Sequence, residues 1–252
     1  MAPRRTILKN GLLLGVGFAL LPRLTLAQTP RFSRIIDLSH TIEVGGQPAL
    51  TMEPTRSYDK DKMNINRWTI TEHGGTHIDV PLHFTANGAS LESIPLSDLI
   101  APLVVIDIAR RAETNPDTAV IPDDIAAWEK ANGALPAGCC VVMHSGWGKK
   151  FGTPAYGGRG ADGKAHVPGF HVDTAKLLLT RDVKGIGVDT ASIDQGGVSG
   201  FPAHNAWLPA GRWDLEGLNN LDQVPAKGAT IVVGALKVKG ATGGPARIMA
   251  LI

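Results

Sequence analysis

The sequence predicts an α/β protein built on one mixed β-sheet. Apolar runs at 103–108 and 139–143 are typical of strands that are buried on both faces. Segments with helical signals separate such runs along the chain, as expected when helices pack against a sheet. The 252 residues, 43% of them hydrophobic and 19% charged, can form one sizeable core, so we expect a single folded domain.

Local patterns define the expected strands. Apolar or alternating runs predict strands over seven segments: 34–38, 66–72, 103–108, 139–144, 185–190, 230–238 and 247–252. The last two are expected to be neighbours in the sheet.

Three helices are expected between these strands. Pro122 at the first turn, two aspartates after it and Gly133 beyond the end predict a helix over 122–132. Asp173 is expected to cap a helix that ends at Leu179, and a short helix is expected to begin near Ala203.

The segments 45–62, 148–169 and 191–202 are expected to be loops because they are rich in glycine, proline or charge. Residues 45–62 contain Tyr58 as their one aromatic residue, and a loop beside a site often determines specificity. Residues 148–169 are rich in glycine and carry four basic residues. They are interpreted as a solvated surface loop or, alternatively, as a lid or a subunit contact.

The first 27 residues have the features of a secretory signal peptide. Arg4 and Arg5 precede an apolar run from Gly11 to Leu21, and the small residues at 25–27 form a cleavage site. The arginine pair resembles a twin-arginine signal, which implies export of a folded protein. A membrane anchor is not favoured, because the run is shorter than the roughly 20 apolar residues that span a bilayer. We expect a periplasmic mature domain at 28–252.

Charge and cysteine content argue against two features of this domain, a basic surface that binds nucleic acid and a disulfide bond. Removing residues 1–27 takes away four basic residues and no acidic one, so the formal net charge changes from +2 to −2. Such a chain has no basic field for nucleic acid. Cys139 and Cys140 are adjacent, and neighbouring Cα atoms lie about 3.8 Å apart, below the roughly 4.4 Å that a disulfide needs. Both are expected in the core.

Residues 73–84 concentrate the chemistry of the chain, because three of its eight histidines and one aspartate lie there. A straight strand would hold His73 and His77 roughly 13 Å apart. Gly74 and Gly75 allow the backbone to bend between them, and His77 and Asp79 then share one face of an extended segment. Imidazole and carboxylate side chains bind zinc, manganese or iron, so this stretch predicts a metal site, with His83 nearby. An extended chain would carry His83 about 13 Å beyond Asp79, to the rim of the site, unless the loop curls back.

The same stretch resembles the signature of the cyclase-type metal-dependent hydrolases, a family that includes bacterial kynurenine formamidases and isatin hydrolases. Its pattern, H-x-G-T-H-x-D-x-P-x-H-F, is met at every fixed position of residues 73–84. The resemblance implies the swivelling β/β/α fold with a mixed sheet, and assembly as a homodimer or larger oligomer.

A second block extends the resemblance. It contains Asp189-Thr-Ala-Ser-Ile-Asp194, then Ala203-His204, then Glu216 twelve residues later. The resemblance implies that His204 and Glu216 complete a two-ion centre in which Asp79 is the bridge, with His73 and His77 as the other ligands. Whether one or two ions bind, and whether they are Zn or Mn, stays open.

Further residues are assigned around this centre. The resemblance implies that His83 is the general acid/base, while Trp68 and Phe84 are candidates for stacking on an aromatic substrate and Ser145 for a polar contact. His40 is interpreted as a structural group or one that orients a ligand. Asp189 and Asp194 either orient ligands or cap strand ends.

The function that follows is hydrolysis of a small-molecule amide, either an N-formyl aromatic amine or a cyclic amide such as isatin, by metal-activated water. Two other interpretations remain open. One is a lactonase or ring-closing cyclase that acts on a non-aromatic substrate. The other is a periplasmic binding protein that binds metal or ligand without catalysis.

Overall fold

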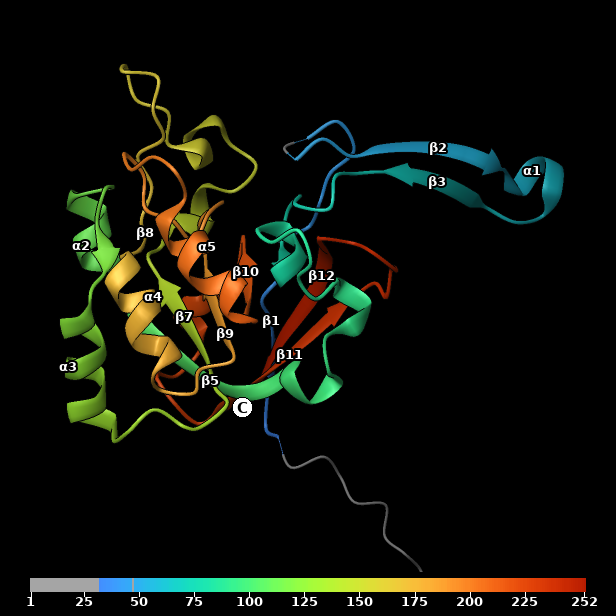
Figure 1. Ribbon diagram of the computed structural model, residues 1–252. Coiled ribbons are helices and arrows are strands. Elements are labelled where there is room, and N and C mark those ends of the chain that lie inside the picture. Colours follow the sequence, from blue (N-terminus) through green and yellow to red (C-terminus); the bar gives the residue numbers. More distant parts are fainter. Residues whose placement is uncertain (1–31, 47) are drawn as a thin grey trace, which may run out of the picture. The chain divides into compact units, whose positions relative to one another are not determined.

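A closed, mixed β-sheet organises residues 32–46 and 48–252, the part of the chain that the computed structural model describes (Figure 1). The strands are ordered β1-β12-β11-β5-β7-β9-β10-β4, and β4 pairs again with β12, so that the sheet closes on itself. The predicted α/β class is confirmed. The segment expected to be a signal peptide, residues 1–27, lies outside the described residues.

Parallel and antiparallel pairs occupy different parts of this sheet. The pairs β5–β7, β7–β9 and β9–β10 are parallel, and the other pairs of the sheet are antiparallel. Strand bounds are β1 Ile35–Asp37, β4 His77–Asp79, β5 Ile100–Asp107, β7 Cys140–His144, β9 Gly185–Val188, β10 Trp213–Glu216, β11 Ala229–Ala235 and β12 Gly243–Leu251. The expectation that the last two strands are neighbours is confirmed.

Each face of the sheet contributes to a separate hydrophobic cluster. Side chains that alternate along the strands, such as Ile78, Leu215 and Ile231, form the cluster inside the closed sheet. The opposite face packs against helices, where Ile125, Leu178 and other side chains cover strand residues. The two cysteines lie on opposite faces, are buried and are free, as expected.

Helices cover the outer face of the parallel strands (Figure 1). They are α2 Ala109–Thr114, α3 Pro122–Asn132, α4 Val172–Leu179 and α5 Pro202–Trp207. The helix predicted over 122–132 is confirmed, as is the short helix near residue 203. The predicted cap of α4 is wrong: His171 is the N-cap, and its Nδ1 accepts the backbone N–H of Asp173, which lies in the first turn. None of the described helices is long and apolar enough to cross a membrane.

The loop expected over residues 45–62 is wrong for most of its length. It contains β2 Thr51–Arg56 and the one-turn helix α1 Tyr58–Asp61, and β2 pairs with β3 Ile65–Thr69 as an antiparallel hairpin. The interruption of the register after Pro54 explains how proline is accommodated in a strand. All residues of both strands are exposed, so the pairing depends on main-chain hydrogen bonds rather than on burial.

The segment 148–169 has little regular structure, as expected. It contains two short 3-10 turns, which span Trp147–Lys150 and Pro154–Gly157. The segment ends where β8 Gly169–Phe170 pairs with β6 Ala119–Val120. His166 attaches the segment to the domain through a 2.7 Å contact from its Nδ1 to Asp117.

A glycine on β9 allows the largest side chain of β10 to lie across the inner face of the sheet. Gly185 pairs with Trp213, and a Cβ at position 185 would lie 2.2 Å from atoms of the indole ring. Trp213 is buried, with 2% of its surface exposed. Gly185→Ala should therefore lower the free energy of unfolding by roughly 1–3 kcal/mol, the usual cost of overpacking. Chemical denaturation measures it. Gly157→Ala, where a Cβ meets nothing within 4 Å, is the control and should change stability by less than about 0.5 kcal/mol.

Candidate metal centre

The backbone bends immediately before β4, so that His73 and His77 approach the same point. Gly75 makes the bend in the left-handed region at φ +73°, where a Cβ would also lie 2.9 Å from Ile42. The hydroxyl of Thr76 donates to the Gly217 carbonyl at 2.5 Å and accepts the backbone N–H of His40 at 2.9 Å. These contacts fix the start of β4 against the end of β10.

The register of two antiparallel strands then places four polar side chains on one face. Asp79 of β4 lies opposite Asp214 of β10, and His77 lies opposite Glu216. The residues between them, Ile78 and Leu215, point into the closed sheet. The four polar residues are buried on the other face. His204 joins them from α5.

The carboxylate of Asp79 lies at the centre of this cluster and is within 4 Å of four imidazoles. His73 Nδ1 is 2.6 Å and His77 Nε2 is 3.2 Å from Asp79 Oδ1. His204 Nε2 is 3.5 Å and His83 Nε2 is 3.8 Å from Asp79 Oδ2.

Glu216 borders the same centre, at 3.5 Å from His77 Nε2 and 3.2 Å from His204 Nε2. The structure thus brings together all five residues predicted to bind metal, together with His83.

Hydrogen bonds outside the cluster fix the tautomers of two histidines. His77 Nδ1 lies 2.9 Å from the carbonyl oxygen of Gly75, which can only accept, so Nδ1 carries the proton. His204 Nδ1 is held at 2.6 Å by the carboxylate of Asp194. In each ring Nε2 is therefore left to face Asp79 and Glu216.

His73 is oriented by a longer chain of contacts. Thr242 lies 2.5 Å from Glu72 and donates its hydroxyl proton to that carboxylate. The hydroxyl can then accept a proton from His73 Nε2 at 2.9 Å, which leaves His73 Nδ1 facing Asp79. Such contacts behind a ligand orient it in metal sites.

This arrangement fits a divalent cation. An unprotonated imidazole nitrogen and a carboxylate oxygen repel one another unless a proton or a cation lies between them. His77 Nε2 is buried and has no hydrogen-bond partner among the described residues, although Asp79 and Glu216 lie nearby. Two groups of the described residues fit a metal ion by donor type and by approach to one point: His73, Asp79 and His83, and Asp79, His204, Asp214 and Glu216. His77 belongs to neither group, although its Nε2 lies 3.2 Å from Asp79 Oδ1.

Without an ion, the same groups shift one another's protonation. Burial alone would lower the pKa of His77, but the Asp79 carboxylate 3.2 Å away and the charge of Glu216 raise it to about 9. Burial would raise the pKa of Asp79, but the neighbouring imidazoles of His204, His73 and His77 hold it well below its usual value. Since a metal ligand must be deprotonated, an ion bound here would displace a proton from His77.

The position of His83 differs from the geometric expectation. A continued strand would carry His83 about 13 Å beyond Asp79, at the rim of the site. Pro81–His83 instead form a 3-10 turn, which returns the ring to Asp79 and stacks it on His73 at 3.9 Å between ring centroids. The side chain is 31% exposed. Burial, against an opposing effect of Asp79, lowers its pKa, so the ring is neutral at pH 7.

Two phenylalanines border the imidazoles. Phe84 stacks on His204 at 4.7 Å between ring centroids and meets His83 edge-on at 4.8 Å. Phe201, which the sequence did not suggest, contacts Phe84 at 5.8 Å and is 56% exposed. Its φ of +51° is unusual for a bulky residue, and such conformations occur often at functional sites.

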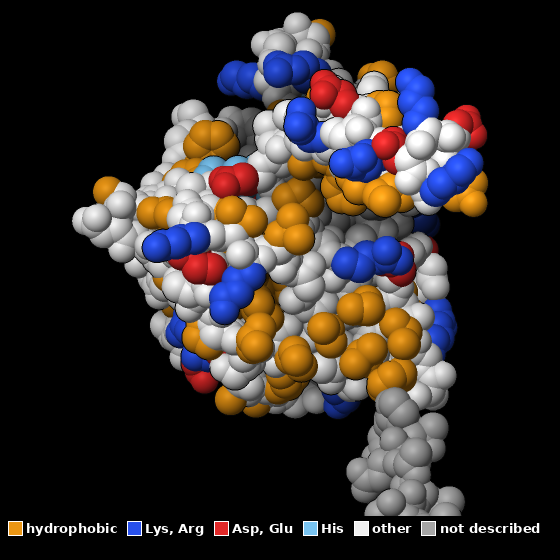
Figure 2. All heavy atoms as spheres, turned by 90° about the vertical axis from the view of Figure 1, so that its right-hand side faces the viewer, with side chains coloured by type: hydrophobic (Ala, Val, Ile, Leu, Met, Phe, Trp, Pro, Cys, Tyr) orange, Lys and Arg blue, Asp and Glu red, His pale blue; other side chains and the backbone are white. Residues whose placement is uncertain are grey.

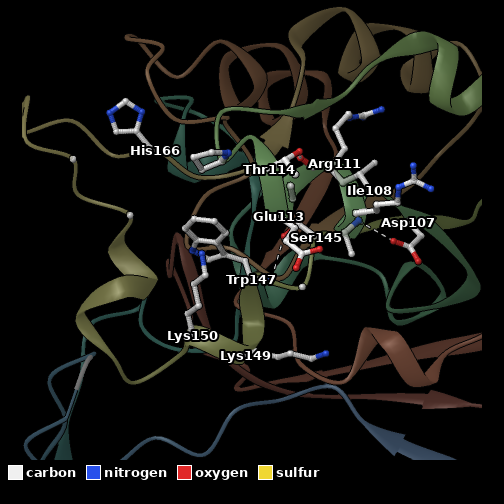
Figure 3. Close-up of a pocket in the computed structure, with 17 residues that line it drawn as sticks. Asp107, Ile108, Arg111, Glu113, Thr114, Ser145, Trp147, Lys149, Lys150 and His166 are labelled. Carbon is white, nitrogen blue, oxygen red and sulfur yellow. Dashed lines mark hydrogen bonds between the residues drawn. The ribbon is translucent and has the colours of Figure 1, made fainter.

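Two predicted substrate contacts lie elsewhere in the structure. Trp68 is on the exposed hairpin and is 70% exposed. Ser145 is buried and donates its hydroxyl to Asp189 at 2.5 Å. Ser145 also borders a cavity of about 1570 Å³, which Figure 3 shows with Trp147, Lys150 and Arg111 around it. None of the residues predicted to bind metal lines this cavity.

The two aspartates and the histidine that were predicted to support the site lie in different positions around it. Asp194 binds His204 and therefore orients a predicted ligand, whereas Asp189 supports Ser145. His40 stacks on Phe151 at 3.9 Å between ring centroids, and burial lowers its pKa to about 4.

Asp214 and Thr242 were not predicted to belong to the site. The alternation Trp-Asp-Leu-Glu at 213–216 was a signal for Asp214, because it places that residue on the same face as Glu216. Nothing near Thr242 in the sequence indicates its contact with His73, which is 169 residues earlier.

Comparison with known proteins shows the same combination of fold and motif. Residues 36–195 match the Cyclase family, described as "Putative cyclase". The chain is 33% identical to isatin hydrolase from Roseibium aggregatum over 215 residues, which cover 81% of this chain and 82% of that protein. It is 28% identical to kynurenine formamidase from Salinibacter ruber over 197 residues, which cover 78% and 84%.

A solved structure also matches the fold of this chain. Isatin hydrolase A from Labrenzia aggregata, bound to benzyl benzoate, matches with a TM-score of 0.81 and 33% identity over 87% of this chain and 93% of that chain. The matched family segment contains β4 and the residues His73, His77, Asp79 and His83 of the cluster, whereas His204 and Glu216 lie beyond it. The chain therefore belongs to the cyclase family of metal-dependent hydrolases.

Proposed function

We propose that this protein hydrolyses the carbon–nitrogen bond of a small amide, either an N-formyl aromatic amine or a cyclic amide such as isatin. The observation that carries the proposal is the Asp79 carboxylate, which lies within 4 Å of four imidazoles beside Glu216. The similarity to an isatin hydrolase and to kynurenine formamidases supports an amide as substrate.

The proposed ligands are His73, His77 and Asp79 for one ion, with His204 and Glu216 for a second ion that shares Asp79. Zn²⁺ and Mn²⁺ both suit these donors. A bound ion would polarise the amide carbonyl and lower the pKa of water to near 7. Thr242 and Asp194 keep His73 and His204 in the required tautomers.

His83 is proposed to transfer the proton. It is neutral at pH 7 because burial lowers its pKa, so it can take a proton from the attacking water. It can then give that proton to the leaving nitrogen, which completes cleavage to a carboxylic acid and an amine. Phe84 and Phe201 offer aromatic faces beside His83 and His204 for the substrate.

A substrate panel tests this proposal. The metal-loaded protein should hydrolyse at least one of the N-formyl aromatic amines or cyclic amides, and chelation followed by dialysis should abolish turnover. Lactones serve as the comparison set. Faster turnover of lactones than of all amides would favour the lactonase alternative, and metal binding without turnover of any compound would favour a binding protein.

The ligand assignment predicts the effect of two substitutions. His77→Ala and Asp79→Ala each remove one donor from a group of three, and both should reduce ion affinity and turnover by more than about 100-fold. Elemental analysis of the purified variants gives the ion content. Asp189→Asn, a buried residue outside the cluster, is the matched control and should keep the wild-type ion content. A full ion complement in Asp79→Ala would show that the ligand set is incorrect.

A different result is expected for His83. His83→Ala should keep its ions but lose roughly 10²–10⁴-fold in turnover of an amide, the usual contribution of a general acid/base. The loss should be smaller for an activated ester, whose leaving group needs no proton. Ion content and the amide-to-ester rate ratio of the one variant distinguish the roles. Loss of the ion together with activity would make His83 a ligand, as its 3.8 Å distance from Asp79 permits.

We also propose that the protein is a homo-oligomer that acts on a small molecule. Exposed apolar side chains on or beside the hairpin support self-association: Met52, Tyr58, Met63, Ile65 and Trp68. Figure 2 shows apolar side chains gathered over a broad area of the same face, with basic and acidic groups interspersed rather than joined into a basic field.

Export to the periplasm is proposed from Arg4 and Arg5 before the apolar run. Replacing both arginines with lysine should leave folded protein in the cytoplasm, because a twin-arginine signal depends on the arginine pair. Immunoblots of separated periplasmic and cytoplasmic fractions measure this. Unchanged export of the lysine variant, in a strain that lacks the folded-protein pathway, would contradict the assignment.

A further inference from the structure

Asp214 is a buried acidic residue that the function proposed above does not use. It lies on β10, two residues before Glu216, and is 0% exposed. Neither of its side-chain oxygens has a hydrogen-bond partner among the described residues. A buried carboxyl group without a partner is costly, because it has given up its hydrogen bonds to water. The position therefore needs a compensating partner.

The side chain of Asp214 faces the metal centre. It lies directly opposite Asp79 in the register of β10 against β4. One ligand atom from each of Asp79, His204, Asp214 and Glu216 lies within 4.8 Å of the others. Four donor atoms this close together from two strands and a helix can share a single ion.

The charges around Asp214 favour a cation at this point. Asp79, Asp214 and Glu216 bring three carboxylates to one buried region, and like charges on directly opposed strand positions destabilise a sheet. Asp194 does not relieve this repulsion, because it is acidic itself and its oxygens accept bonds from Ala203 and His204. A divalent cation between the three carboxylates would replace their repulsion with attraction.

Building on the proposed function, we infer that Asp214 is a direct ligand of one of two ions, together with Asp79, His204 and Glu216. We call this ion the inner ion, because all four of its ligands are buried. The outer ion is then held by His73, His77 and Asp79. The inner site has three carboxylates and one imidazole, a donor set richer in oxygen than that of most zinc sites, and Mn²⁺ prefers such donors.

The test uses the metal-depleted mature protein and the isosteric variant Asp214→Asn. Calorimetric titration with Mn²⁺ should give two sites in the wild-type protein, and the second should be weaker by more than about 100-fold in the variant. Two ions bridged by Asp79 should also give a spin-coupled paramagnetic resonance spectrum, which should become that of isolated Mn²⁺ in the variant.

Asp189→Asn is the matched control. Asp189 is also a buried aspartate, close to the end of the neighbouring strand β9, but it binds Ser145 and belongs to no candidate ion site of the described residues. This variant should keep two sites and the coupled spectrum. If Asp214→Asn fails to fold, Asp214→Ala is measured in its place, and the same loss of one site is expected.

The other outcomes separate the two proposals. Two sites of unchanged affinity in Asp214→Asn, or a single site in the wild-type protein, would overturn the role of Asp214. The proposed hydrolase would survive either result, provided that one ion supports turnover. A wild-type protein that binds no Mn²⁺ or Zn²⁺ would overturn the proposed function itself, and with it the inference.

Discussion

The approach of four imidazoles to the Asp79 carboxylate is the interaction on which the rest of the centre depends. Burying a charged group costs several kcal/mol even after the protein relaxes around it, unless partners compensate. In the absence of an ion the imidazoles compensate as proton carriers, and His73, His77 and His204 would compensate as ligands of a bound ion. Each neighbouring element serves this one carboxylate: the glycine bend brings His73, the turn at Pro81–His83 brings His83, and α5 brings His204.

The two faces of the sheet have different roles. Alternation along β4 and β10 places apolar residues inside the closed sheet and polar residues on the outer face. The inner cluster holds the strands in register, and the register determines which donors are opposite one another. A one-residue slip of β4 against β10 would turn its donors away from Glu216. The stability of the apolar interior and the geometry of the centre are therefore coupled.

Much of this centre could be predicted from the sequence, because its donors are concentrated in two short blocks with recognisable spacing. The α/β class and the helix over 122–132 were also predicted correctly, since their signals are local. The strand predicted over 66–72 is confirmed in part by β3, but its partner β2 was missed because it carries proline and charge and buries nothing, so no hydrophobic period marks it. His83 was placed too far from Asp79, because a strand-length argument does not foresee a 3-10 turn.

The closure of the sheet by β12 determines the order in which the centre can form. Gly243–Pro245 pair with β4, and Thr242 just before them orients His73, although 169 residues separate the two in the chain. A nascent chain has most of the candidate ligands long before it has this last strand. Contacts between such distant parts of a chain are made late and slowly in folding. High-affinity binding of an ion would accordingly follow the pairing of β12 with β4 rather than the nucleation of folding.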